Sequence, residues 1–120
     1  MADSDLQHAA EAEEITIGFQ RPDGSTGSTP VWIVRAGDDI FVRSMHGQRG
    51  GWYRRLRANP DGLLTDEAHT HQVRAEPVAD EATRQEVTRA YESKYGRSPY
   101  VEPLLSEEAI GATLRLQPRA

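Results

Sequence analysis

Short stretches in which apolar and polar residues alternate recur along the chain and predict β-strands. In the first stretch, residues 14–20, the side chains of Ile15, Ile17 and Phe19 fall on one face. Five further strands are expected over residues 31–36, 40–44, 63–65, 70–78 and 113–117. Residues 31–36 are apolar on both faces, which predicts a central strand. Residues 22–28 are predicted to form a loop because they are rich in Gly, Ser, Thr and Asp.

Two segments carry helical spacing instead. From Gly51 onward, Trp52, Tyr53 and Leu56 share one side of a helix that ends before Pro60. A longer amphipathic helix is expected from an N-cap at Asp80 to about residue 96. Six strands with a helix after the third and a longer one after the fifth predict an α+β fold, a small antiparallel β-barrel.

The bulk composition sets limits on this picture. A chain of 120 residues suits one domain, here residues 15–120, preceded by an acidic segment, residues 1–14, that is either a tail or a short helix. The absence of cysteine excludes disulfides, thiolate chemistry and zinc–sulfur sites. No apolar run is long enough to span a membrane and the first residues do not form a signal peptide, so a cytoplasmic protein is expected. A hydrophobic content of 37% favours a domain that recovers apolar burial in a dimer.

Charge is distributed unevenly. Residues 43–57 contain five arginines and no carboxylate, whereas the whole chain has a formal net charge of −5. Glycines stand just before the predicted helix at residues 47, 50 and 51, where backbone N–H groups and the helix dipole can approach a phosphate. Ser44 and the arginine side chains can add hydrogen bonds. The pattern predicts a site for the phosphate of a cofactor; a solvated arginine face is the alternative.

Three histidines allow further chemistry. His46 lies in the arginine-rich segment, where it can contact a phosphate or donate a proton, or can be a plain exposed turn residue. His69 and His71 have a spacing compatible with a metal ion. Neither a carboxylate nor a third histidine is obviously matched to them, so no metal site is predicted.

Three runs together resemble the flavin-binding split-barrel superfamily: Pro-Val-Trp-Ile-Val-Arg at residues 30–35, Phe-Val-Arg-Ser at 41–44, and Gly-Trp-Tyr-Arg-Arg-Leu-Arg-Ala-Asn-Pro at 51–60. Within that superfamily, the last run resembles the deazaflavin-dependent nitroreductases. Residues 89–96 and 112–116 resemble a smaller, functionally uncharacterised branch of small bacterial domains. The likeness covers roughly residues 15–118.

The resemblance implies a six-stranded antiparallel split β-barrel, commonly a homodimer, that binds FMN or a deazaflavin. The phosphate would be met at the end of the third strand and the start of the next helix. Transferred to this chain, the cofactor-binding residues are Arg43, Ser44, Arg49, Gly50, Gly51, Trp52 and Arg54. Residues 23–29 lack the basic residues that related reductases carry there. This departure weakens the case for a long, multiply charged deazaflavin tail and leaves a single-phosphate flavin, another anion or a lost cofactor.

The resemblance also suggests that Tyr91, Tyr95 and Tyr100 line the substrate side. Core packing is the favoured interpretation for Tyr91, so Tyr100 and His46 are the catalytic candidates. Three functions compete: a small flavin- or deazaflavin-linked oxidoreductase, a non-catalytic dimeric binding or structural module, and a nucleic-acid-binding module. Trp52 and Tyr53 among arginines motivate the last, but the acidic net charge argues against a long polyanion.

Overall fold

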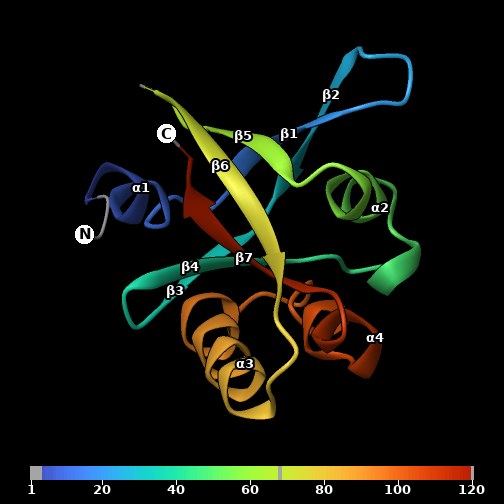
Figure 1. Cartoon of the computed structure of the whole chain (residues 1–120). Helices are drawn as coiled ribbons and strands as arrows, with labels where there is room; N and C mark the ends of the chain where they lie inside the picture. The colour runs from blue at the N-terminus through green and yellow to red at the C-terminus, as the bar shows by residue number, and fades with distance from the viewer. Residues whose placement is uncertain (1–3, 68, 120) are drawn as a thin grey trace.

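The chain folds around one curled antiparallel sheet (Figure 1). The computed structural model describes residues 4–67 and 69–119, and the sheet within them has seven strands in the order β2-β1-β5-β6-β7-β4-β3. In chain order the strands are β1 Ile15–Gln20, β2 Thr26–Val31, β3 Ile33–Ala36, β4 Asp39–Arg43, β5 Asp61–Thr65, β6 Thr70–Pro77 and β7 Thr113–Pro118. The predicted α+β split barrel is confirmed, with seven strands where six were expected.

The helices lie around this sheet. In chain order they are α1 Ser4–Ala9, η1 Gly47–Arg49, α2 Gly51–Ala58, α3 Glu81–Tyr95, η2 Glu102–Leu105 and α4 Glu107–Ile110. α3 packs on β3, and α2 packs on β1. Among the residues described, no helix is long and apolar enough to cross a membrane.

Alternation along β4 divides its side chains between two apolar clusters. Ile40 and Val42 belong to the larger cluster, which also contains residues of β1, β5, β6 and β7. Phe41 belongs to a smaller cluster that packs with α3. The alternation of residues 40–44 predicts that Phe41 and Arg43 share a face, and this is confirmed because Arg43 also contacts α3.

The strand predicted over residues 31–36 is wrong in its bounds and its position. A break at Trp32 divides it, because Val31 ends β2, which pairs with β1, and Ile33 begins β3, which pairs with β4. β3 is an edge strand and not a central one. Its first two residues are nevertheless buried on opposite faces, since Ile33 packs in the larger cluster and Val34 in the smaller one. Apolarity on two faces therefore reflects two covered faces here, not two neighbouring strands.

β2 also begins inside the predicted loop, at Thr26. It is the other edge strand, and most of its residues are at least partly exposed. An exposed edge strand needs few apolar residues. The composition of residues 26–28 therefore indicates a loop although these residues form the start of a strand.

The start of α3 and the N-terminal segment are held in place by different contacts. Asp80 caps α3 as predicted, since its Oδ2 accepts the N–H of Thr83 at 2.9 Å. Hydrogen bonds from Thr83 lower the pKa of the Asp80 carboxyl. Within the N-terminal segment, α1 packs on the barrel through Leu6 and Ala9; residues 1–3 lie outside the described range.

Candidate functional site

The chain between β4 and β5 turns twice before it becomes helical. Gly47 has a φ of +65°, a left-handed conformation that glycine adopts without steric cost. Gly50 is the N-cap of α2, and its carbonyl accepts the N–H of Arg54 at 3.0 Å. Within the described residues no side chain caps this helix start. The first-turn N–H groups, with the positive end of the helix dipole, are therefore available to an anion.

Gly50 and Gly51 differ in the space that surrounds them. The hydroxyl oxygen of Ser44 occupies the space that a Cβ at position 50 would need. Ser44 is buried, and its Oγ has no hydrogen-bond partner in the part of the chain described. Gly50 therefore accommodates Ser44. Gly51 faces open space, because a Cβ there would meet nothing within 4 Å.

Arg43 points into the protein. It is 2% exposed, and its guanidinium donates to Thr113 Oγ1 (2.8 Å), to the Leu104 carbonyl (3.1 Å) and to the Arg84 carbonyl (2.8 Å). The guanidinium also lies over the ring of Tyr91. Burial lowers the pKa of Arg43 to about 10. Among the described residues it forms no ion pair, so Arg43 joins β4 to α3, η2 and β7 as a buried cation.

The other four arginines of the segment do not converge. Arg49 approaches Glu108 at 3.6 Å, with both side chains largely exposed, a contact of small energetic value. Arg57 donates to the Tyr53 hydroxyl at 3.3 Å. Arg54 and Arg55 are exposed on α2. The predicted cluster is thus one buried cation, one exposed pair and a basic helix face.

A cleft of about 440 Å³ opens beside the start of α2. Three aromatic side chains, a methionine, a histidine and a glutamate are among its lining residues: Trp32, Trp52, Tyr100, Met45, His46 and Glu14. The two large apolar side chains that are exposed among the described residues, Tyr100 (71%) and Met45 (47%), both lie here. Arg43 and Leu104 also contribute to the lining. The structure therefore brings Trp52, His46 and Tyr100 together.

Trp32 and Met45 were not predicted as site residues. Trp32 sits at the break between β2 and β3, and its ring stacks on Tyr95 with centroids 4.2 Å apart. Because residues 31–36 are apolar on both faces, no local signal in the sequence marks Trp32 as a site residue. Met45 adjoins His46, but its exposure depends on the turn geometry. Tyr91 and Tyr95 are themselves buried, at 0% and 4% exposure.

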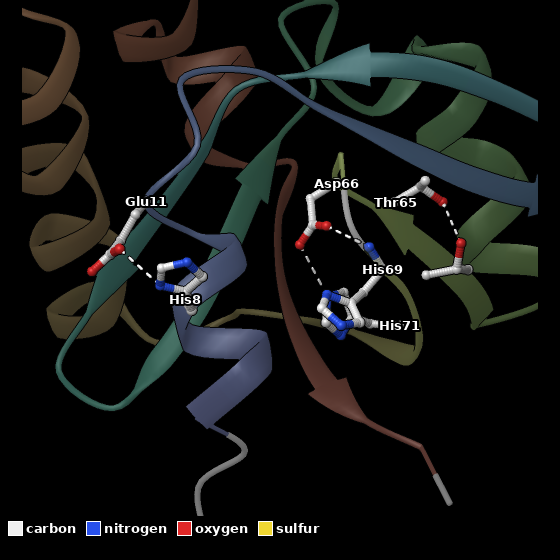
Figure 2. A network of polar contacts seen from close by, with 7 residues as sticks. His8, Glu11, Thr65, Asp66, His69 and His71 are labelled. Atoms are coloured by element: carbon white, nitrogen blue, oxygen red, sulfur yellow. Dashed lines mark hydrogen bonds and ion pairs between the residues drawn. The ribbon is translucent and has the colours of Figure 1, made fainter.

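The histidine pair lies elsewhere, at the β5–β6 hairpin (Figure 2). His71 Nε2 is 3.2 Å from Asp66 Oδ2, and the backbone N–H of His69 donates to Asp66 Oδ1 at 2.7 Å. The expectation that no carboxylate is matched to these histidines is wrong, because the hairpin turn returns residue 71 to residue 66. The Thr65 and Thr70 hydroxyls form a further bond at 3.3 Å. No group of three or more potential ligands within the described residues could hold a metal.

Solved structures with this fold share little sequence with the chain. HutZ, a heme storage protein from Vibrio cholerae, has a TM-score of 0.73 at 16% identity, over 99% of this chain and 91% of that one. A conserved hypothetical protein from Mycobacterium tuberculosis has 0.70 at 14%, over 100% and 81%. An F420-H2-dependent reductase, FDR-A, has 0.68 at 15%, over 88% and 94%. No curated protein matches the sequence.

The curled sheet and these likenesses define the fold as a split β-barrel, which the F420-H2-dependent reductase shares. More narrowly, the chain belongs to the bacterial family DUF2255, described as an uncharacterized protein conserved in bacteria, whose model matches residues 5–116.

Proposed function

We propose that this protein binds a flavin-type phosphate cofactor, FMN or a deazaflavin, in the cleft beside α2 and acts as a small oxidoreductase. One observation carries the proposal: an aromatic-lined cleft adjoins an uncapped helix start that has basic side chains and no carboxylate of its own. The first feature suits a planar ring, and the second suits a phosphate.

The ring side of the site is built from rigid aromatic groups. Trp32 is held against Tyr95, and Trp52 makes an edge contact with Tyr53 at 6.5 Å. Both indoles thus have an aromatic neighbour, are half-buried and line the cleft. A cleft of about 440 Å³ lies within the range of roughly 300–1,000 Å³ typical of small-molecule sites. Planar rings stack well on such surfaces.

The phosphate side begins at Gly51. Its open surroundings allow a phosphate oxygen to reach the first N–H groups of α2. Arg54 and Arg49 lie on this helix and on the turn before it, and can add charged hydrogen bonds. Arg43 and Ser44 support the site from behind: Ser44 is buried against Gly50, and Arg43 places a positive charge in the inner lining of the cleft.

The bound cofactor would supply the hydride chemistry, and the chain would bind it, orient it and exclude water. His46, at the cleft, is the candidate to donate or accept a proton at its imidazole. Tyr100, at the rim, is the candidate to contact the substrate. The alternative is a non-catalytic dimeric module, in which a second copy would cover the exposed side chains of Met45 and Tyr100.

Titration of the purified protein with FMN, with coenzyme F420 and with hemin tests the proposal. FMN or F420 should bind with quenching of tryptophan emission, because Trp32 and Trp52 lie in the cleft. Hemin is included because His46 could ligate iron. Silence with both flavins would overturn the proposal. Flavin binding without turnover of any nitro- or quinone-type acceptor in the presence of a reductant would favour the non-catalytic module.

A further inference from the structure

The open edge of the sheet at β3 is closed by side chains of α3. The N–H of Ile33 donates to the Tyr95 hydroxyl at 3.3 Å. The carbonyl of Ile33 accepts from Lys94 Nζ at 2.6 Å. These side chains stand where a further strand would otherwise satisfy the edge.

The same two side chains hold the segment between α1 and β1. Lys94 Nζ donates to the carbonyls of Ala10 (2.7 Å) and Ala12 (2.6 Å). The Tyr95 hydroxyl donates to the carbonyl of Glu13 at 2.5 Å. Ile15 pairs with Val31 where β1 meets β2, so Lys94 and Tyr95 add side-chain hydrogen bonds to two segments that this strand pairing brings together.

Both connected segments continue directly into the cleft. Trp32 precedes Ile33, Glu14 follows Glu13, and both line the cleft. Trp32 is fixed twice more, since its carbonyl accepts from the Tyr91 hydroxyl at 2.7 Å and its ring stacks on Tyr95.

We propose that Tyr91, Lys94 and Tyr95 are positioning residues that fix Trp32 and Glu14 and thereby set the width of the cleft. An ammonium group has three donors, and Lys94 directs them at three carbonyls from two segments. Charged donors make the stronger hydrogen bonds. This role rests on the proposed function, because a fixed cleft wall matters only if the cleft binds a ring.

The test compares Lys94→Met with Val87→Ala. Methionine keeps the apolar length of lysine but has no donor, so the carbonyls of Ala10, Ala12 and Ile33 lose the donor that they share. Val87 is buried on the same helix in the smaller cluster, against which Trp32 also packs, and its truncation destabilises α3 without removing a hydrogen bond to Ile33 or to residues 10–13. Trp32 is observed alone by placing both changes in a Trp52→Phe background. FMN affinity is measured in chains that retain Trp52.

Lys94→Met should expose Trp32 to acrylamide quenching and red-shift its emission. It should also weaken FMN binding roughly tenfold, a loss similar to the energy of one charged hydrogen bond. Lys94→Arg, which keeps charged donors, should recover part of each of these three effects. Val87→Ala should lower stability without producing any of them.

Equal quenching of Trp32 in Lys94→Met and Val87→Ala would overturn the positioning role. FMN binding of unchanged affinity in Lys94→Met would also overturn it. If the native chain binds no flavin but Trp32 still responds selectively to Lys94→Met, the proposed cofactor is wrong while the positioning of Trp32 by α3 stands.

Discussion

The buried hydroxyl of Ser44 fills the space beside Gly50 in which a side chain at position 50 would lie. Ser44 directly follows β4, and Gly50 is the N-cap of α2. Their contact holds the helix start against the sheet, and it makes the glycine and the small side chain mutually necessary.

Gly50→Ala should therefore destabilise the fold by about 1–3 kcal/mol, the usual cost of overpacking a buried site. Urea unfolding at neutral pH measures the change. Because Ser44→Ala removes the obstructing oxygen, the double variant should be more stable than the sum of the single effects. Additive effects would show that the two residues do not compete for this space.

Gly51→Ala should have the opposite effect on stability. A Cβ at this position meets nothing within 4 Å, and alanine favours a helix over glycine by about 0.5–1 kcal/mol. The same methyl group would stand where the phosphate is proposed to bind. A rise in unfolding free energy together with weaker FMN binding is expected, and equal or tighter binding would remove Gly51 from the site.

Arg43→Met should be strongly destabilising. The substitution leaves the Leu104 and Arg84 carbonyls and the Thr113 hydroxyl without their guanidinium donors, at a cost of about 3 kcal/mol. Arg43→Lys retains the charge but cannot match the planar fork, so an intermediate loss is expected. Denaturant curves that superimpose on the native one would contradict a structural role for Arg43.

Arg54→Ala should leave stability nearly unchanged and weaken FMN binding about tenfold, since an exposed arginine acts through a charged hydrogen bond to phosphate. Riboflavin, which lacks the phosphate, should bind both chains alike. Arg89→Ala is the matched control, because Arg89 is likewise exposed but lies on α3. A similar loss in both variants would indicate a general charge effect and not a phosphate contact.

Lys94 should make stability depend on pH in the alkaline range. Burial lowers its pKa from 10.5 to about 8, against the opposing charges of Glu13 and Glu11. Between these values the unfolded chain binds more protons than the folded chain, so stability rises with pH. Below about pH 8 the lysine is charged in both states, and its contribution is constant.

The unfolding free energy of the native chain minus that of Lys94→Met should accordingly increase from about pH 8 to 10.5. Lys94 is the only lysine in the chain, so the Nζ signal of ¹⁵N-lysine-labelled protein reports its titration without assignment. If this difference in unfolding free energy instead falls as the pH rises over the same range, the lowered pKa of Lys94 is contradicted.

The elements that follow from local pattern were predicted well. Asp80 caps α3 because a short side-chain acceptor before an amphipathic run satisfies the first N–H groups. The alternation of Ile40, Phe41 and Val42 places them correctly in two clusters because successive side chains of a strand point to opposite faces. Both are properties of a few consecutive residues.

The site was predicted less completely. Trp52, His46 and Tyr100 do line one cleft, but Trp32 enters it through a break that no local pattern required. The charge of residues 43–57 predicts one cluster, whereas in the structure Arg43 turns inward and the remaining arginines are exposed.

Periodicity and capping chemistry thus assigned the strands other than β2 and β3, the two longer helices and the α+β class, because each depends on backbone geometry repeated over neighbouring residues. The curl of the sheet determines which distant residues become hydrogen-bond partners. Arg43 meets acceptors 41, 61 and 70 residues away, and Lys94 meets one 84 residues away. Which carbonyls remain without a strand partner, and which side chains reach them, depends on how distant segments pack, and residue order along the chain does not encode that locally.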